Sequence, residues 1–290
     1  MRVVVSGATG LIGQALMPRL REAGHEPIPL SRKAKVGGLT WDLDAGRIDS
    51  FEGVGAVVHL AGESVAGRWS DERKRRILES RVRGTELIAR ACVEAGVGTL
   101  VSASATGYYG DRGATELDAS AEPGEGFLAD VCVQWEASAQ AARDAGARVA
   151  HPRIGVVLAP EGGALAKMKT PFKMGVGGKI GDGSQYMPWV HVADVARMIA
   201  FAVDDARVVG PFNACAGSVT NAELTAALGE VLSRPTVLPL PRFAARLAMG
   251  REMADEMLLS SIRAVPVRLR EWGFVPEHAV LRAALRDVLR

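Results

Sequence analysis

The chain has 290 residues, with 35 Lys and Arg against 33 Asp and Glu and a formal net charge of +2. Hydrophobic residues make up 48% and charged residues 23%, a mixture typical of a folded globular protein rather than a disordered one. The near-neutral charge argues against a general binder of nucleic acid or membrane surfaces, so we expect neither as a partner. Three separated cysteines without a CxxC pair argue against a disulfide framework and a cysteine zinc site.

The N-terminal apolar run, residues 3–5, is too short for a signal peptide and glycine follows it closely. No stretch approaches the roughly 18 apolar residues that would span a bilayer. We therefore expect a soluble, cytoplasmic protein that acts on a small molecule. Its oligomeric state is left open by the sequence.

Strand-like and helix-like segments alternate through the first half of the chain. The expected strands are 3–5, 27–30, 39–41, 56–60, 99–102 and 148–150, and the expected helices are 11–23, 71–95 and 127–145. Repeated β–α units with continuous apolar strands predict a parallel sheet covered by helices on both faces. The predicted fold class is therefore α/β, a Rossmann-type doubly wound sheet.

The second half has a different pattern. The glycine-rich run 162–183 cannot form one regular element, and an apolar helix follows His191 and Asp194. Residues 211–215 read as one more strand, and the pattern after Asn221 is mainly helical. We predict a nucleotide-binding domain over 1–160, with returning elements near 189–216, and a smaller, mainly helical substrate-side domain over 161–290.

The most informative segment is a glycine-rich loop between the first strand and the first helix. Its spacing is GxxGxxG, in which Gly7 allows a tight turn, Gly10 lets the backbone approach a pyrophosphate, and Gly13 permits close helix–strand contact. The helix N-terminus offers free N–H groups to the anion. Because a strand precedes the loop and a helix follows it, the motif predicts a dinucleotide site. The predicted contacts here are Gly7, Thr9, Gly10, Leu11, Ile12 and Gly13.

The end of the second strand indicates which dinucleotide binds. An NAD site places Asp or Glu here to hold the ribose 2′-hydroxyl, whereas this chain has Ser31 followed by Arg32 and Lys33. A carboxylate would repel the 2′-phosphate of NADP, and arginine can pair with it through two hydrogen bonds. Ser31 and Arg32 therefore predict NADP(H) as cofactor. The alternative interpretation is a pair of solvated cations in a loop.

Several further motifs, in this order and spacing, carry a family resemblance. They are residues 7–13, 30–33, 59–63 (HLAGE), 68–69 (RW), 80–85 (SRVRGT), 102–110 (SASATGYYG), 135–136 (WE), 188–194 (PWVHVAD) and 258–261 (LLSS). Together they resemble an atypical extended short-chain dehydrogenase/reductase, and more narrowly the YfcH-type NAD(P)-dependent epimerase-like family. Members of that family carry a small C-terminal domain of unknown function.

The resemblance implies an NADP-binding Rossmann domain with a substrate pocket under a C-terminal cap. It suggests that Leu60, Ala61 and Gly62 line the cofactor, and that Ser102, Ile154 and Val157 lie near the nicotinamide. Within the basic helix 71–95, Arg81 is the residue best placed to reach the cofactor, while residues 73–76 read as a solvated face.

The usual proton-transfer motif of these enzymes, Tyr-x-x-x-Lys, is absent. In that motif the lysine lowers the pKa of the tyrosine, so that the phenol exchanges a proton near neutral pH. None of the three tyrosines has a lysine four residues later. Aligning Glu136 with the acidic residue that often follows the motif places Leu128 and Cys132 at the tyrosine and lysine positions. Arg81 stands where these enzymes often have asparagine.

Two interpretations follow. In the first, the protein is an NADP(H)-dependent oxidoreductase or epimerase of an unidentified small carbonyl, hydroxyl or nucleotide-sugar substrate. Its replacement acid or base would come from Tyr108 or Tyr109, with Arg112 or Arg81 as a cationic neighbour. Ser104 or Thr106 would be the hydrogen-bonding partner, although the two tyrosines also fit a turn that packs the loop. In the second, the protein is a catalytically silent NADP(H)-binding regulator or interaction protein.

Two other polar residues are candidates with simpler explanations. His191 and Asp194 could form an acid–base pair, but we expect Asp194 to cap the helix that follows and His191 to satisfy nearby backbone. His25, His59 and His151 lie beside strands without metal-ligand spacing, so we predict no metal site.

Overall fold

The computed structural model describes residues 1–33 and 36–289. Its strands are β1 (Arg2–Ser6), β2 (Glu26–Ser31), β3 (Leu39–Asp42), β4 (Arg47–Ile48), β5 (Val54–His59), β6 (Thr99–Ser102), β7 (Ser104–Ala105), β8 (Glu116–Leu117), β9 (Arg148–Ile154), β10 (Val156–Leu158), β11 (Tyr186–His191), β12 (Gly210–Ala214), β13 (Gly217–Thr220) and β14 (Arg263–Ala264). Its helices are α1 (Leu11–Glu22), α2 (Asp71–Ala95), α3 (Phe127–Ala137), α4 (Gln140–Asp144), α5 (Gly163–Lys173), α6 (Val192–Asp204), α7 (Asn221–Leu232), α8 (Arg242–Met249), α9 (Arg251–Ala254), α10 (Val267–Glu271) and α11 (Leu281–Leu289). A 3₁₀ turn, Thr106–Tyr109, follows β7, and a π-helical turn, Asp255–Leu259, follows α9.

The main sheet has the strand order β12-β9-β6-β5-β1-β2-β3-β4, and β7 pairs with β9 beside it. All of its pairs are parallel except the β3–β4 pair. The chain builds outward from β1 through β2 and β3, and then returns to the other side of β1 at β5. The strand order therefore reverses between β1 and β5, which is where ligands bind in sheets of this kind.

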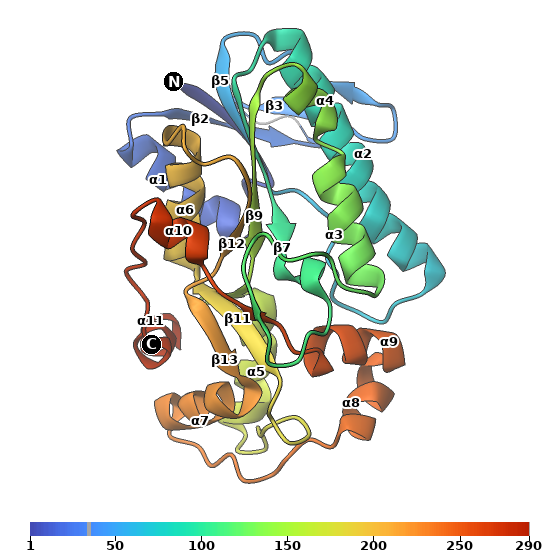
Figure 1. Cartoon of the computed structure of the whole chain (residues 1–290), viewed down its shortest axis with the longest axis vertical. Helices are drawn as coiled ribbons and strands as arrows, with labels where there is room; N and C mark the ends of the chain where they lie inside the picture. Colours follow the sequence, from blue (N-terminus) through green and yellow to red (C-terminus); the bar gives the residue numbers. More distant parts are fainter. Residues whose placement is uncertain (34–35, 290) are drawn as a thin grey trace.

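Alternating side chains of the central strands bury on opposite faces of the sheet. Val3 and Val5 pack with α1 and α6, whereas Val4 packs with residues of α2. All three valines are fully buried, and burying such a side chain is worth about 1.5–3 kcal/mol. Figure 1 shows the resulting layers, with α1 and α6 on one side of the sheet and α2, α3 and α4 on the other. The predicted fold class is confirmed.

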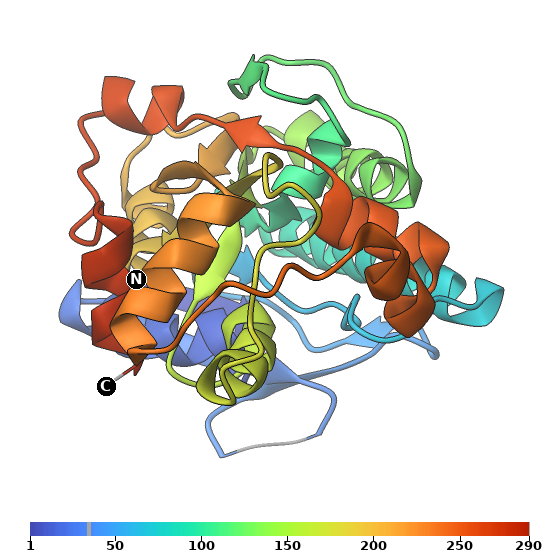
Figure 2. The same ribbon diagram turned by 90° about the horizontal axis from the view of Figure 1, so that it is seen from below.

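A second layer lies beyond the carboxyl ends of the main strands. Here β10, β11 and β13 form a three-stranded sheet, whose core includes residues of α5, α7 and α11. In the view from below (Figure 2), the C-terminal helices α8 and α9 lie beside α3 and α2. Lys74 Nζ on α2 lies 3.0 Å from Glu252 Oε1 on α9, and the backbone N–H of Phe127 on α3 donates to Glu256 in the π-helical turn after α9.

Two predicted elements differ from the observed ones. The predicted helix 127–145 is broken, because α3 ends at Ala137 and α4 begins at Gln140. At the break, two side chains donate hydrogen bonds to backbone carbonyls in the last turn of α3. Ser138 Oγ donates to the Gln134 carbonyl at 2.7 Å, and Arg143 donates to the Glu136 carbonyl at 2.7 Å. The glycine-rich run 162–183 contains the helix α5, and the rest of it is irregular, as expected.

Of the returning elements near 189–216, β12 joins the main sheet beside β9, whereas β11 pairs with β10 in the smaller sheet. The division of the chain at residue 160 stays a prediction. No helix among residues 1–33 and 36–289 is long and apolar enough to cross a bilayer.

Candidate functional site

The glycine loop closes tightly against the sheet. Gly7 has φ +71°, and a Cβ there would lie 2.9 Å from the backbone of Ala61. A Cβ on Gly13 would lie 2.2 Å from the Gly7 carbonyl oxygen, so only glycine allows α1 to approach the loop this closely. The helix begins at Leu11 with no side-chain cap on its N-terminus. The first-turn amides are therefore left without partners from the helix itself, as an anion site requires.

A cavity of about 770 Å³, which we call the dinucleotide cavity, opens in front of this loop. Most of the predicted cofactor residues meet there, from the glycine loop, the end of β2 and the segment after β5. The lining residues are Gly7, Ala8, Thr9, Gly10, Pro29, Leu30, Ser31, Arg32, Lys33, Trp41, Leu43, Leu60, Ala61, Gly62, Glu63 and Ser80. Arg32 is exposed in this lining, and no hydrogen bond or ion pair joins its side chain to another described residue.

A buried pair of side chains holds the two walls of the switch point together. Ser6 Oγ lies 2.6 Å from His59 Nδ1 and accepts hydrogen bonds from the backbone N–H groups of Leu60 and Ala61. Because its lone pairs are used in this way, the hydroxyl donates to His59. Burial lowers the pKa of His59 to about 3, so the ring is neutral. This network sets the segment after β5 against the glycine loop.

A second cavity has a volume of about 280 Å³, and we call it the substrate-side cavity. Residues 256–262, which we call the C-terminal segment, form one side of it. Its lining comes from at least six separate stretches of chain. The residues are Val65, Arg81, Ala105, Thr106, Gly107, Leu128, Val131, Cys132, Ile154, Gly155, Val156, Met168, Ile180, Gln185, Tyr186, Met187, Pro188, Asn221, Glu256, Met257, Leu258, Ser260 and Ile262.

Arg81 connects the two cavities. It lines the substrate-side cavity, and a Cβ on Gly62, in the dinucleotide cavity, would lie 3.2 Å from the Arg81 guanidinium carbon. Its guanidinium donates to the carbonyls of Glu63 and Ile77, both at 3.0 Å, and lies 5.0 Å from the ring centre of Trp135. Burial lowers the pKa of this guanidinium. Arg81 is therefore a fixed part of the wall between the cavities.

The positions aligned with Tyr-x-x-x-Lys also lie in the substrate-side cavity. Leu128 and Cys132 both line it, one helical turn apart on α3. Burial raises the pKa of the Cys132 thiol to about 11, so the thiol is protonated at neutral pH. In the predicted alignment, the tyrosine and lysine positions therefore hold an alkyl group and a neutral thiol.

The three predicted catalytic residues are absent from the described lining of both cavities. Tyr109 is fully buried, and its hydroxyl lies 2.6 Å from Asn213 Oδ1 and 3.0 Å from Arg153, while burial raises its pKa to about 12. Tyr108 lies under the Arg153 guanidinium, 3.4 Å from ring centre to carbon. Ser104 Oγ donates to Glu136 at 2.6 Å. A catalytic role for these residues stays a prediction, and the geometry favours a structural one.

The remaining predicted cofactor residues are distributed around the two cavities. Ile154, like Arg81, lines the substrate-side cavity. Ser102 is fully buried at the end of β6, and Ile12 and Val157 pack against the core between the sheet and α1. Leu11 lies against the glycines that open α5. These four residues and Gly13 do not line the dinucleotide cavity, and direct contact with a cofactor stays a prediction for them.

Sequence reasoning missed the residues that the C-terminal half brings to the site. Tyr186 is the tyrosine that lines the substrate-side cavity, and the Arg263 guanidinium lies 5.1 Å from its ring centre. Glu256 accepts the backbone N–H groups of Phe127 and Leu128, at 2.9 and 2.8 Å, and so caps α3 from a distant part of the chain. The motif at 258–261 was a signal for this region, because it begins two residues after Glu256.

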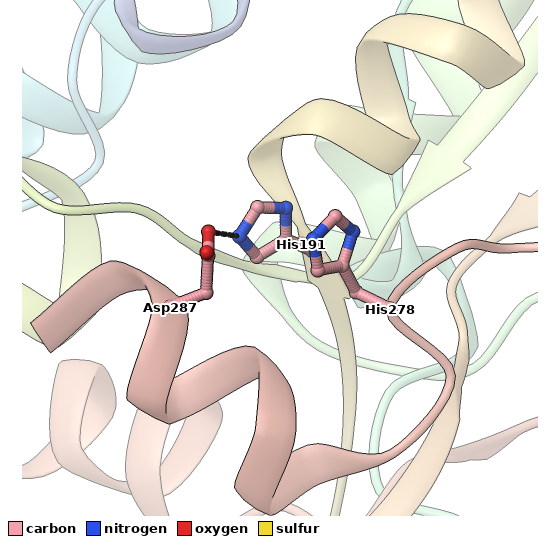
Figure 3. A group of neighbouring side chains, drawn as sticks. All are labelled: His191, His278 and Asp287. Carbon is pink, nitrogen blue, oxygen red and sulfur yellow. Dashed lines mark ion pairs between the residues drawn. The ribbon is translucent and has the colours of Figure 1, made fainter.

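Figure 3 shows a polar cluster at the end of β11, formed by His191, His278 and Asp287. His191 Nε2 lies 3.2 Å from Asp287 Oδ2, and the two imidazole rings stack with centres 3.7 Å apart and planes 17° apart. Nitrogen lone pairs lie in the ring plane, so stacked rings do not direct both nitrogens at one ion as a tetrahedral metal requires. The expectation of no metal stays a prediction.

The prediction that Asp194 caps α6 is wrong, whereas the prediction that His191 satisfies nearby backbone is confirmed. His191, and not Asp194, caps α6, since its Nδ1 accepts the Ala193 N–H at 3.2 Å. Asp194 is fully buried and accepts the backbone N–H groups of Glu277 and His278, at 2.9 and 2.8 Å. The carboxylate therefore binds the backbone at residues 277 and 278 instead of capping the helix.

Together, the strand order, the glycine loop and the cavity at the switch point define a Rossmann-type protein with a dinucleotide site. Residues 3–215 match the NAD dependent epimerase/dehydratase family, and residues 240–288 match a domain of unknown function, DUF1731. The chain belongs to the NAD dependent epimerase/dehydratase family. The resemblance to an atypical extended short-chain dehydrogenase/reductase with a small C-terminal domain is thereby confirmed.

Similar proteins cover the whole chain. An epimerase family protein of Mycobacterium bovis is 42% identical in an alignment 289 residues long. The alignment covers 98% of this chain and 96% of that protein. The crystal structure of the human epimerase family protein SDR39U1 (isoform 2) with NADPH is 34% identical, with a TM-score of 0.93 over 100% of this chain and 99% of that one. The cofactor predicted from Ser31 and Arg32 agrees with the NADPH of the human structure.

A third match has a more specific printed name. The structure of a nucleoside-diphosphate sugar epimerase from Corynebacterium glutamicum is 36% identical, with a TM-score of 0.84. The match covers 100% of this chain but 58% of the other, so the Corynebacterium protein contains a large part with no counterpart here.

Proposed function

We propose that this protein binds NADP(H) and catalyses hydride transfer, as an oxidoreductase or epimerase acting on a small molecule. The observation that carries the proposal is the position of the two cavities. The dinucleotide cavity begins at the glycine loop and reaches Gly62, and Gly62 lies against Arg81 in the wall of the substrate-side cavity. A cofactor laid along the first cavity would thus end beside the second.

The residues present fit NADP(H). The uncapped first turn of α1 would hold the diphosphate through backbone N–H groups. Arg32, exposed in the lining, would pair with the 2′-phosphate, and no carboxylate stands at the end of β2 to oppose it. Leu60 to Gly62 would pack along the cofactor. The NADPH of the human relative supports the same choice.

When bound, the cofactor supplies a hydride with its electron pair to a carbonyl carbon, and the carbonyl oxygen must then take up a proton. Glu256 is engaged as an acceptor of two amide N–H groups, and the Cys132 thiol has its pKa raised. Among the other lining groups, Tyr186 carries a phenol, which serves enzymes as a general acid, whereas Thr106 and Ser260 carry alcohols. We propose Tyr186 as the proton donor.

The cofactor proposal is tested by calorimetric titration of Arg32→Ala with NADPH and with NADH. A charged hydrogen bond is worth about 1.5–3 kcal/mol, so the variant should lose roughly 10- to 150-fold in NADPH affinity while NADH affinity stays nearly unchanged. Arg21→Ala, which alters an exposed arginine at the far end of α1, is the matched control. Equal losses for both nucleotides would contradict the role of Arg32.

A second candidate function is supported by a specific observation. Leu128 and Cys132, which the sequence predicts at the tyrosine and lysine positions, line the substrate-side cavity without offering the usual proton donor, so the protein could bind NADP(H) and regulate or sequester it without chemistry. Following NADPH absorbance across a panel of carbonyl compounds discriminates between the two. Oxidation that depends on substrate and falls in Tyr186→Phe supports the enzyme, and tight binding without turnover supports the regulator.

A further inference from the structure

We propose that the substrate-side cavity takes a small, uncharged and largely apolar carbonyl compound that carries a hydroxyl group, or the alcohol formed from it, and that it excludes nucleotide sugars. This inference rests on the proposed function, because it concerns the molecule that would receive the hydride. It goes against the substrate class that the name of the Corynebacterium structure suggests for that protein.

The volume of the substrate-side cavity suits a small ligand. The cavity holds about 280 Å³, which is below the roughly 300–1,000 Å³ of sites for drug-sized ligands. The C-terminal segment closes one side of it through the π-helical turn, which contributes Glu256, Met257 and Leu258 to the lining. The larger dinucleotide cavity is required by the cofactor itself. A nucleoside diphosphate joined to a sugar would therefore have to extend out of this cavity.

The charged side chains of the cavity lining favour an uncharged ligand. One basic and one acidic side chain, Arg81 and Glu256, line the cavity, and both already have partners. A diphosphate is usually held by free arginine or lysine side chains or by a helix N-terminus. The N-terminus of α3 lies at this cavity, and the Glu256 carboxylate occupies it by accepting two of its amide N–H groups. The protein thus fills its own anion position, and an added phosphate would meet a carboxylate.

Gln185, in the cavity lining, has a buried hydrogen-bond acceptor that lacks a partner among the described residues. Gln185 is 6% exposed, and its Nε2 donates to the carbonyls of Leu258 and Ile180, at 3.1 and 3.3 Å. Because both of those atoms are acceptors, the amide orientation is fixed by chemistry. Its Oε1 then has no hydrogen-bond partner among the described residues. Leaving such an atom unpaired costs about 1–3 kcal/mol. Because Gln185 lines the cavity, we expect a ligand hydroxyl that reaches this buried oxygen to recover the cost.

The rest of the lining is apolar. Val131, Ile154, Met168, Met187 and Ile262 surround the few polar groups. An apolar cavity with one or two polar anchors selects a molecule with an apolar body and a fixed polar end. The two methionines have flexible side chains that can adapt to different shapes of such a body.

The test uses the full chain in three measurements. NADPH binding is first measured by calorimetry, without any substrate. NADPH oxidation is then followed with a panel of neutral aliphatic and aromatic hydroxyketones and hydroxyaldehydes, and separately with UDP-glucose. Finally, UDP-glucose is titrated into the protein saturated with NADP⁺. We expect NADPH binding, oxidation with members of the neutral panel, and neither turnover nor binding of UDP-glucose.

A size variant sharpens the test. Met168→Ala should enlarge the cavity and raise kcat/KM for a bulkier member of the panel over a smaller one by on the order of tenfold, the discrimination that one or two methylene groups provide. Met174→Ala, an exposed methionine just after the same helix, should leave that ratio unchanged. Because the ratio compares two substrates on one variant, a change in stability does not imitate the effect.

The possible failures are distinguishable. If NADPH binds but UDP-glucose also binds or turns over, or if the neutral panel gives no turnover, the substrate inference is overturned while cofactor binding stands. If NADPH does not bind, the proposed function fails and this inference fails with it.

Discussion

The two cavities of this protein are built in opposite ways. The dinucleotide cavity is made from short contiguous motifs at the ends of adjacent strands β1, β2 and β5. The substrate-side cavity is assembled from stretches as far apart as Val65 and Ile262, and it depends on the C-terminal segment for its closure. The first is fixed by local backbone geometry, whereas the second exists only when distant parts of the chain are packed together.

The largest effect should come from the glycine loop. Gly13→Ala would place a Cβ 2.2 Å from the Gly7 carbonyl oxygen, with the backbone of Ala8 also in contact. Overpacking of this kind typically costs about 1–3 kcal/mol, and it would also displace the amides that hold the diphosphate. We expect NADPH binding to be lost in calorimetry. Gly98→Ala, where a Cβ meets nothing within 4 Å, should bind normally, and a Gly13→Ala variant that does the same would contradict the assignment.

The two tyrosine hydroxyls separate chemistry from structure. Tyr186→Phe should lower kcat by about 10²-fold or more, the usual contribution of a general acid, with little change in thermal stability. Tyr109→Phe removes one buried hydrogen-bond partner from Asn213 Oδ1 and one from Arg153, and it should cost about 1–3 kcal/mol of unfolding free energy. Once folded, Tyr109→Phe should retain most of its activity. The reverse outcome would return the catalytic role to Tyr109.

The free energy of unfolding should fall steeply in acid. Burial lowers the pKa of His59 to about 3 and that of His151 to about 4, so the unfolded chain binds protons that the folded chain does not. The stability they contribute is complete above pH about 6.5 and is lost as the pH falls toward these values. Between about pH 5.5 and 4.5 the two together give a slope of about 2 kcal/mol per pH unit.

Urea unfolding at a series of pH values measures this slope. His59 supports the dinucleotide cavity, whereas His151 contacts Arg143 next to the Glu136 network. His151→Gln should therefore remove about half of the slope and leave NADPH affinity at neutral pH unchanged. An unchanged slope in this variant would show that His151 is not held neutral in the folded protein.

The smallest effect concerns the closure of the substrate-side cavity. Glu256→Ala removes the cap that α3 receives from the C-terminal segment and should cost about 0.5–2 kcal/mol in a urea melt. Glu252→Ala removes an exposed ion pair with Lys74 and should cost no more than about 1 kcal/mol. NADPH affinity should be the same in both variants. A loss of cofactor affinity in Glu256→Ala alone would show that the two cavities are not independent.

The difference between the cavities explains what the sequence could predict. Gly7, Gly10 and Arg32 could be placed because each acts within one β–α unit, where spacing along the chain fixes position in space. Tyr109 was a reasonable candidate, but nothing local shows that its hydroxyl is fully buried against Asn213, more than 100 residues away. Gln185, Tyr186 and Glu256 carry no motif for chemistry, and their role depends on how the C-terminal segment packs.

The same limit applies to secondary structure. The helices 11–23 and 71–95 were predicted nearly to their ends, because their apolar residues repeat with helical spacing. The break near Ser138 was missed, since it depends on Arg143 reaching back to the Glu136 carbonyl. The exchange of roles between His191 and Asp194 was missed for a similar reason, because the partners of Asp194 lie beyond residue 270.

The most direct test of the central claim is a pair of calorimetric titrations of the unmodified protein, one with NADPH and one with NADH. The account predicts that both bind and that NADPH binds roughly 10- to 150-fold more tightly, because Arg32 recognises the added phosphate. Absence of binding heat with either nucleotide, or tighter binding of NADH, would contradict it.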